Sequence, residues 1–265
     1  MYDASVGRFF AQDRFAEKYF PVSPYQYAIN NPIRYIDVNG DSIWVNYGNN
    51  QRVYYDNGTL YNEDGSEYEG DNKFVSAVSK TLQRMSETEI GDEVLNSLVS
   101  SENNFIFKNE QSAAGSRSAQ FIRENEGGGV IKAAVLLNND VFEGQKIETT
   151  AHELFHGYQN DNGQWIPSTN NEVGAYLFGR AVVLTLANYG INAFGNSTTE
   201  GKTYEQAMNS LLLDKFDIRS YNIATRTFRK GSIANSRGNY NSLPDFQHIK
   251  MFQKPLISNF YPLVR

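Results

Sequence analysis

The chain has 265 residues and a formal net charge of −6 at pH 7, with 40% hydrophobic and 20% charged residues. This composition is typical of a globular chain with one large domain or two smaller ones. Because Lys and Arg are few and scattered, neither nucleic acid nor an anionic membrane is expected as a partner. There is no cysteine, which excludes disulfides, thiolate metal sites and a cysteine nucleophile. Any metal ion must therefore be held by His, Asp or Glu.

Targeting segments are not predicted in this chain. The first ten residues, MYDASVGRFF, contain no cationic stretch followed by an apolar segment, so a signal peptide is not expected. No apolar run approaches the length of a membrane span. If the protein leaves its cell, another element has to carry it.

Residues 1–41 differ in composition from the rest of the chain. They are rich in aromatic residues, Asn, Pro and Gly and show neither a helical nor a strand period, which predicts an irregular arm. The segment resembles the end of the core domain of bacterial Rhs/YD-repeat proteins. The matching stretches are Tyr2-Asp3, Gly7-Arg8-Phe9, Asp13, Pro24-Tyr25-Gln26-Tyr27, Asn30-Asn31-Pro32, Tyr35-Ile36-Asp37 and Asn39-Gly40. The family usually has Pro at the position of Val38, which leaves open whether the self-cleavage associated with this junction occurs here.

The resemblance implies a place for the remaining residues. In Rhs proteins a variable C-terminal tip, very often a toxin, follows the core, so residues 42–265 are expected to be such a tip. The shell-forming repeats are missing, which implies a fragment or a short relic gene. The resemblance also implies secretion or delivery into a target cell as part of a bacterial Rhs protein. A cognate immunity protein that occludes the toxin's cleft is expected for the same reason.

The region from residue 42 to residue 138 contains recognisable strands and helices. Residues 42–70 alternate aromatic and β-branched residues around two turn signals, which predicts two or three short antiparallel strands. The remaining predicted elements are helices from Asp71 to about Met85 and from Glu87 to Ser100, strands from Asn104 to Lys108 and from Val130 to Asn138, and a loop from Glu110 to Arg117.

These elements predict an α+β fold with two parts. The first is the Rhs-core arm of residues 1–41. The second is a domain of residues 42–265, with a β-hairpin region in residues 42–70 and a mainly helical catalytic core in residues 71–265. Residues from Phe216 onward are interpreted as a polar, loop-like tail without chemistry.

The stretch ETTAHELFHGYQ, residues 148–159, contains two of the three histidines of the chain. An apolar stripe predicts a helix here, and its members are Ile147, Ala151, Leu154, Phe155 and Tyr158. His152 and His156 are one turn apart on a shared face, so both imidazoles can reach one Zn²⁺ at roughly 2.0–2.1 Å. Glu153 stands beside the first ligand and can act as general base toward a metal-bound water. The alternative is a hydrogen-bonded structural pair of histidines near the core.

The motif is similar to that of the zincins, a group of zinc metallopeptidases. In these enzymes an edge strand lies beside the motif helix and lines the cleft. The strand predicted from Val130 to Asn138 is the candidate for that place.

A catalytic zinc usually has three protein ligands. Glu172, sixteen residues after His156, is the candidate for the third, because a Gly/Pro/Asn-rich loop separates it from the first helix and it opens a second. That helix is predicted to end at Asn188-Tyr189-Gly190. The arrangement looks like that of the gluzincins. The alternative role for Glu172 is to complement the helix dipole, and the alternative ligand is the third histidine, His248.

Peptide hydrolysis also needs a group that stabilises the oxyanion. Gluzincins often supply a downstream Tyr, His or Arg for this purpose. The candidates are Tyr176, one turn beyond Glu172, and Tyr221, with Arg219 as a further one. A structural role is the alternative for each.

The leading functional hypothesis is a zinc-dependent peptidase that cleaves a protein or peptide in a target cell. His152, His156 and Glu172 would hold the metal, and Glu153 would be the base. A second hypothesis is a non-catalytic structural or adhesive tip with a degenerate metal site. A third is that the same site hydrolyses a non-peptide amide.

Overall fold

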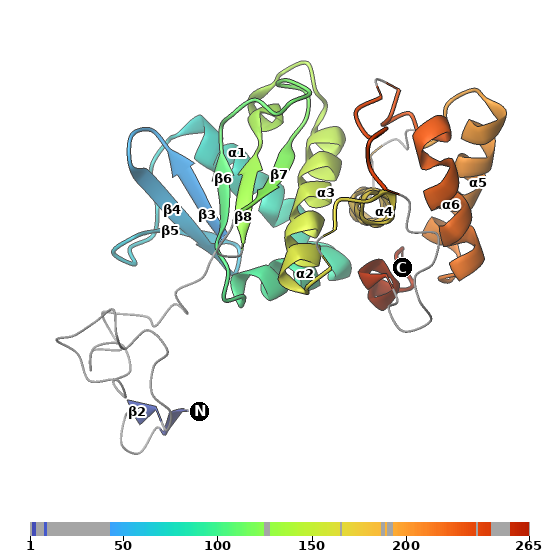
Figure 1. Ribbon diagram of the computed structural model, residues 1–265. Helices are drawn as coiled ribbons and strands as arrows, with labels where there is room; N and C mark the ends of the chain where they lie inside the picture. Colours follow the sequence, from blue (N-terminus) through green and yellow to red (C-terminus); the bar gives the residue numbers. More distant parts are fainter. Residues whose placement is uncertain are drawn as a thin grey trace.

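The computed structural model describes residues 43–124, 128–164, 166–186, 189, 193–236, 238–244 and 255–264. It also gives the backbone of two short paired strands, β1 (Tyr2–Asp3) and β2 (Arg8–Phe9). The rest of the segment that resembles the Rhs core lies outside the described residues, as does His248. Figure 1 shows a β-sheet at one side of residues 43–264 and a group of helices at the other.

Six strands form one mixed sheet in the order β5-β4-β3-β6-β8-β7. They are β3 (Ile43–Tyr47), β4 (Gln51–Asp56), β5 (Thr59–Asn62), β6 (Phe105–Lys108), β7 (Gln120–Arg123) and β8 (Gly129–Lys132). Strands β3, β6 and β8 run parallel, whereas β4, β5 and β7 are antiparallel to their neighbours. The antiparallel strands predicted in residues 42–70 are confirmed. The pairing of β3 with β6 joins these strands to β6, β8 and β7 in the same sheet.

The turn between β4 and β5 is explained by its two central residues. Asn57 has φ +44° and Gly58 has φ +86°, the pair of positive values that a type I′ hairpin turn needs. Asn and Gly are the residues that tolerate this conformation best. The local sequence thus determines this hairpin.

The strand predicted from Val130 to Asn138 is only half correct. Strand β8 ends at Lys132, and Ala134–Leu137 form a short 3₁₀ helix, η3. A continuous apolar run does not distinguish a buried strand from a buried helical turn, which explains the error. In addition, β8 is an inner strand, so the expectation that it borders the motif helix as the edge strand is wrong. The edge strand is β7, whose four residues gave no sequence signal.

Helix α1 lies against β3, α3 lies against β7 and β8, and α2 packs on α1 and α3. The helices are α1 (Lys73–Ser86), α2 (Glu89–Val99), α3 (Glu143–Asp161), α4 (Thr169–Thr185), α5 (Thr199–Leu213) and α6 (Ile218–Gly231), followed by the 3₁₀ helix η4 (Leu256–Phe260). Both helices predicted before residue 100 are confirmed. Helices α4, α5 and α6 pack beyond α3, away from the sheet (Figure 1). No described helix is both long and apolar enough to cross a bilayer.

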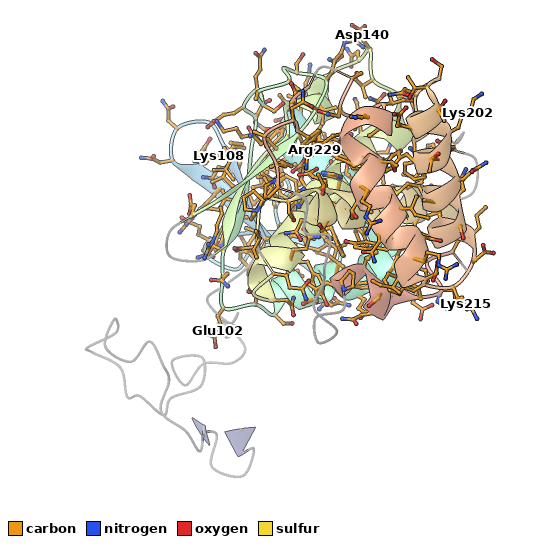
Figure 2. The ribbon with its side chains drawn as sticks, turned by 45° about the vertical axis from the view of Figure 1, so that its right-hand side comes forward. Glu102, Lys108, Asp140, Lys202, Lys215 and Arg229 are labelled. Carbon is orange, nitrogen blue, oxygen red and sulfur yellow. The ribbon has the colours of Figure 1, made fainter. Side chains whose placement is uncertain are left out.

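The prediction of a loop-like tail after Phe216 is wrong, because α6 occupies residues 218–231. Its buried residues are Tyr221, Ala224, Thr225, Phe228 and Gly231. The first four follow the i, i+3, i+4, i+7 spacing of a helical stripe, although polar residues surround them. In Figure 2 the charged side chains of Lys202 and Lys215 project outward from the helical part of the molecule, as expected for a solvated face.

Close packing of α3 against α4 brings the site residues together. A Cβ at Gly179 of α4 would lie 2.6 Å from the carbonyl oxygen of Glu148 in α3, so the two backbones approach to a distance that only glycine allows. The buried Arg180 donates a hydrogen bond to the Glu148 carboxylate at 2.8 Å. Next to Gly179, the Phe178 ring stacks on Phe155 of α3, and Phe260 of η4 packs on both rings. These contacts hold α4 against α3.

Candidate metal centre

Helix α3 buries the two histidines of the motif on one face. His152 and His156 are each only 5% exposed, and their rings are nearly perpendicular with centroids 4.7 Å apart. The two Nε2 atoms face one another at 3.1 Å. The predicted helix and the shared face are thus confirmed. Together with Glu153, these residues form a buried group that could hold a metal ion.

Glu172 reaches both histidines from α4. That helix begins at Thr169, three residues before the predicted start, because the Ser168 side chain caps it by accepting a hydrogen bond from the Asn171 N–H. It also ends at Thr185, earlier than predicted. The Glu172 carboxylate places Oε1 3.4 Å from His156 Nε2 and Oε2 3.4 Å from His152 Nε2. Glu172 lies in the first turn, but its side chain faces α3, so a dipole role alone does not account for its contacts.

The two Nε2 atoms and the nearest Glu172 oxygens are separated by distances typical of ligands that share one metal ion. Ligand atoms at 2.0–2.1 Å from a tetrahedral ion lie about 3.3–3.4 Å from one another. The two Nε2 atoms are 3.1 Å apart, and each lies 3.4 Å from a different oxygen of Glu172, which is Oε2 for His152 and Oε1 for His156. By contrast, the nearest Glu153 oxygen is 4.0 Å from His152 Nε2. The Glu172 carboxylate is therefore nearer to His152 Nε2 than the Glu153 carboxylate is.

An unsatisfied carboxylate oxygen also indicates a cation. Glu172 Oε2 is buried without a hydrogen-bond partner among the described residues. Its 3.4 Å approach to His152 Nε2 is an ion-pair distance and does not meet hydrogen-bond geometry. A buried acceptor left unsatisfied costs about 1–3 kcal/mol, and more when it is charged. An ion bound between the three side chains would remove that cost.

The pKa shifts of Glu172 and His156 also indicate that the site favours a cation. Burial raises the pKa of Glu172, but the neighbouring His156 and His152 outweigh it and lower that pKa to about 2. Burial likewise lowers the pKa of His156, but Glu172 and Glu153 reverse the effect and raise it to about 9. The carboxylates of Glu172 and Glu153 therefore stabilise a positive charge at the buried imidazoles. A proton meets this demand in the metal-free protein.

Glu153 is oriented by the edge strand. Its Oε2 accepts a hydrogen bond from the Phe121 N–H of β7 at 2.7 Å. This N–H lies on the open side of the strand, since β7 is paired to β8 on its other side only. The contact keeps Oε2 on the strand and leaves Oε1 as the oxygen nearer the histidines. Phe121 could not be identified from the sequence, because β7 itself was missed.

Of the two tyrosine candidates, only Tyr176 lies beside the histidines. The Tyr176 ring lies 4.2 Å from the His152 ring, and its hydroxyl is 3.0 Å from that of Tyr240. Tyr240 comes from the tail interpreted as having no chemistry, and both phenols line the pocket at the histidines. Tyr221 is buried elsewhere and donates a hydrogen bond to the Asn170 carbonyl at 2.6 Å. Arg219 is exposed on α6 and does not reach the pocket.

The histidines open into a pocket of about 510 Å³. One wall is formed by the segment before β7 and by β7 itself, and the floor by α3 and α4. The other lining residues are Phe194, Tyr204, Ser232, Ile233, Ala234, Asn239 and Tyr240. A volume of this size is within the range of about 300–1,000 Å³ of ligand pockets, so the group can meet a substrate.

Comparison of the chain with protein-family models, with curated proteins and with solved structures finds no match. The role of the buried His–Glu group therefore follows from its own geometry and chemistry.

Gln159 supports the second histidine from one turn further along α3. His156 Nδ1 is 2.8 Å from Gln159 Oε1, and Gln159 Nε2 donates to the Asn171 carbonyl at 3.1 Å. Because the amide nitrogen is engaged with a carbonyl, the amide oxygen faces Nδ1, and Nδ1 must be the donor. The lone pair of the neutral imidazole is then on Nε2, toward the metal site. Histidine ligands commonly have such a partner, and the i+3 spacing in HGYQ was a usable signal for it.

We expect Gln159→Met to weaken zinc binding by about 10–100-fold while the fold is retained, because the substitution removes the acceptor that orients His156. The measurement is a competition titration of zinc against a chelator. Gln83→Met, at an exposed position of α1, is the matched control and should leave the affinity unchanged. Equal affinities of the two variants would contradict the orienting role.

Zinc affinity should also depend on pH. His156, with its pKa raised to about 9, carries a proton at neutral pH in the metal-free protein. That proton must leave before Nε2 can bind a cation. The apparent affinity is therefore expected to increase by about tenfold per pH unit between about pH 7 and 8.5. Calorimetry in buffers of different ionisation enthalpy should show about one proton released per zinc at pH 7, and no release would contradict the assignment.

Proposed function

We propose that residues 42–265 form a zinc-dependent peptidase with a zincin-like active site. His152, His156 and Glu172 are the metal ligands, and Glu153 is the general base. The observation that carries the proposal is the approach of the Glu172 carboxylate to both histidines. Each Nε2 atom is 3.4 Å from one of its oxygens, the two Nε2 atoms are 3.1 Å apart, and the Glu153 carboxylate lies beside them. A motif helix bordered by an edge strand, with the third ligand on the next helix, supports the likeness to gluzincins.

In this proposal the side chains divide the chemistry between them. When bound, zinc supplies a Lewis acid that polarises the scissile carbonyl and lowers the pKa of a water ligand toward about 7. Glu153 Oε1 takes a proton from the attacking water and returns it to the leaving amine. The Phe121 N–H keeps the other oxygen in place during both transfers. Glu172 stays ionised as a ligand, as its pKa of about 2 requires.

A peptide is the substrate class that the pocket wall favours. Strand β7 has a neighbour on one side only, and it lies directly beside the base. Extended peptides bind such free strand edges by adding a further strand. A small amide without an extended backbone would not use this edge, so hydrolysis of a non-peptide amide is the less favoured candidate.

The N-terminal resemblance supplies the biological setting of the proposal. A peptidase that follows an Rhs core would act as a toxin in the cell that receives it. A protein of that cell would be the substrate, and an immunity protein that covers the pocket would protect the producer. A degenerate, non-catalytic tip is less favoured, because the three ligands and the base are all present and in contact distance.

The direct test is cleavage of a peptide library by the purified chain, followed by mass spectrometry. We expect cleavage that a chelator abolishes and that one equivalent of zinc restores. A zinc-loaded chain that cleaves no peptide in the library but hydrolyses simple amides would support the alternative substrate class. A chain that binds no zinc would contradict the proposal itself.

Tyr240 and Tyr176, whose phenols line the pocket, are the groups proposed to stabilise the oxyanion. We expect Tyr240→Phe to lower kcat by about 10²–10³-fold with little change in zinc content, since removal of one oxyanion donor has an effect of this size. Tyr221→Phe is the matched control, because the Tyr221 hydroxyl donates its hydrogen bond to the Asn170 carbonyl at the start of α4 and lies outside the pocket. Equal kcat values for the two variants, measured on the same peptide, would exclude Tyr240 from this role.

A further inference from the structure

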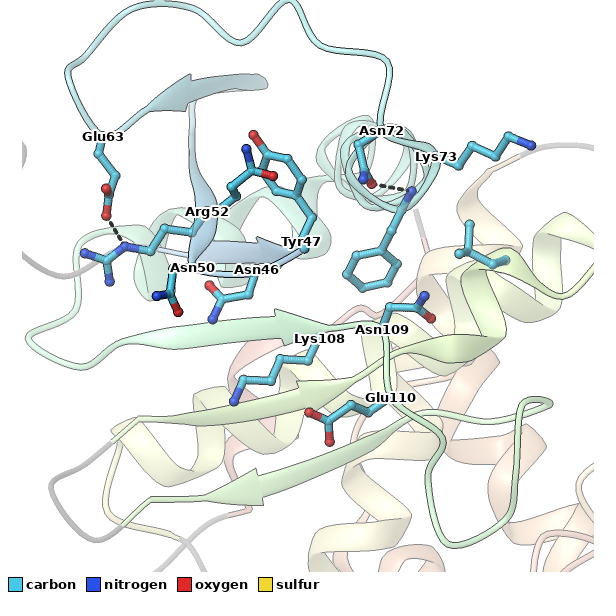
Figure 3. Close-up of a pocket in the computed structure, with 14 residues that line it drawn as sticks. Asn46, Tyr47, Asn50, Arg52, Glu63, Asn72, Lys73, Lys108, Asn109 and Glu110 are labelled. Atoms are coloured by element: carbon cyan, nitrogen blue, oxygen red, sulfur yellow. Dashed lines mark hydrogen bonds and ion pairs between the residues drawn. The ribbon is translucent and has the colours of Figure 1, made fainter.

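A second and larger cavity, of about 950 Å³, opens at the carboxyl ends of β3 and β6. It shares no lining residue with the pocket of the metal centre. Figure 3 shows side chains that enter it from three sources, namely the ends of these two strands, the start of β4 and the start of α1. Nothing in the proposed peptidase mechanism uses this cavity.

The sheet topology explains why a cavity forms at this position. After β3 the chain turns to β4 on one side, and after β6 it runs past β8 to β7 on the other. Two adjacent parallel strands whose connections leave in opposite directions create a crevice at their carboxyl ends. Open α/β sheets bind ligands in such crevices.

A row of polar side chains crosses the sheet at the cavity. The pairing register places Arg52, Asn46 and Lys108 side by side on β4, β3 and β6. Arg52 forms an ion pair with Glu63. The other carboxylate of the lining, Glu110, pairs with Lys132 at 2.9 Å. Lys108 is half-buried and has no ion pair among the described residues, although the whole chain is acidic with a net charge of −6.

Lys108 lies between Asn46 on β3 and Lys132 on β8, and both lysines lower the pKa of the Glu110 carboxyl, the carboxylate that Lys132 pairs with. The other lining groups near it include neutral hydrogen-bonding side chains. Asn46 Oδ1 is buried and accepts no hydrogen bond from the described part of the chain. The remaining carboxamides of the lining are Asn50, Gln51, Asn72 and Asn109. Carboxamides both donate and accept, as hydroxyl groups do. The lining therefore suits a ligand with several hydroxyls and one anionic group.

We propose that this cavity binds a small polyhydroxylated anion, a sugar that carries a phosphate or a carboxylate. The Lys108 ammonium contacts the anionic group, and Asn46 accepts a hydrogen bond from a ligand hydroxyl. Asn50 and Asn109, at opposite sides of Lys108 in Figure 3, bind further hydroxyls. The site is separate from the metal centre, so occupancy does not require zinc.

Isothermal titration of the full chain with glucose 6-phosphate, glucuronate and glucose, at constant ionic strength, tests the proposal. We expect binding of one or both anionic sugars and at least about tenfold weaker binding of glucose, because a charge-assisted hydrogen bond is lost. Comparison of the titrations with glucose 6-phosphate and glucuronate shows whether the site prefers a phosphate or a carboxylate. Equal affinity for glucose and the anionic sugars, or no binding of any of the three, would overturn the proposal.

Variants localise the site. Lys108→Gln should weaken binding of the anionic sugar by about tenfold or more, whereas Lys108→Arg should keep most of it. Lys202→Gln, exposed on α5 in Figure 2, is the matched control and should bind like the parent chain. All three variants should retain their zinc content and circular dichroism. Loss of binding in Lys202→Gln, or undiminished binding in Lys108→Gln, would place the ligand elsewhere and overturn the proposal.

Discussion

Glu153→Gln is expected to keep one zinc per chain and to lower kcat by about 10²–10⁴-fold, the usual contribution of a general acid–base group. The amide oxygen of Gln can still accept the hydrogen bond from the Phe121 N–H, so the side chain should stay in place. The variant loses only the ability to take a proton from water. The three proposed ligands are unchanged, and elemental mass spectrometry should confirm that the metal is retained.

The matched control for this substitution is Glu143→Gln, at the start of the same helix. Glu143 forms a largely exposed ion pair with Lys80 and lies outside the pocket, so its loss should leave turnover unchanged. Comparable turnover by Glu153→Gln and the parent chain would falsify the base assignment. Loss of zinc from Glu153→Gln would instead make Glu153 a ligand.

Glu172→Ala is expected to abolish stoichiometric zinc binding. Removal of an outer-shell partner alone weakens metal affinity by about 10–100-fold, and loss of a direct ligand should exceed that. The parent chain should also gain thermal stability from zinc, by about 2.7 kcal/mol at a free zinc concentration of 100 Kd. Glu172→Ala should lose this gain, because zinc would no longer bind the folded chain more tightly than the unfolded chain.

Two control variants separate the ligand role of Glu172 from a helix-dipole effect and from ligation by His248. Glu200 occupies the first turn of α5, as Glu172 does in α4, and is exposed. Glu200→Ala removes the same favourable interaction with a helix dipole and should leave zinc binding intact. His248→Ala should also retain one zinc. If Glu172→Ala kept its zinc while His248→Ala lost it, the third ligand would be His248.

The local pattern of the sequence was sufficient for α1, α2 and α3, because their apolar residues repeat at helical spacing over three or more turns. It was also sufficient for the β4–β5 hairpin, where Asn57-Gly58 selects the turn type. It failed for β7 and for the second half of the strand predicted after Val130. Only two of the four residues of β7 are apolar, and a continuous apolar run has no period, so neither pattern defines an element. In α6 the stripe was present but was hidden by the polar residues around it.

The sequence alone determined the centre of the candidate site. The i, i+4 spacing places His152 and His156 on one face of any helix that contains them, and the adjacent Glu153 follows from the same geometry. Only the tertiary structure decided the rest. Glu172, Phe121 and Tyr240 reach this face from α4, β7 and the segment after α6, and their positions depend on packing between elements that are distant in the chain. The close α3–α4 approach at Gly179 brings Glu172 to the histidines, and the sheet order places the β7 edge beside the base.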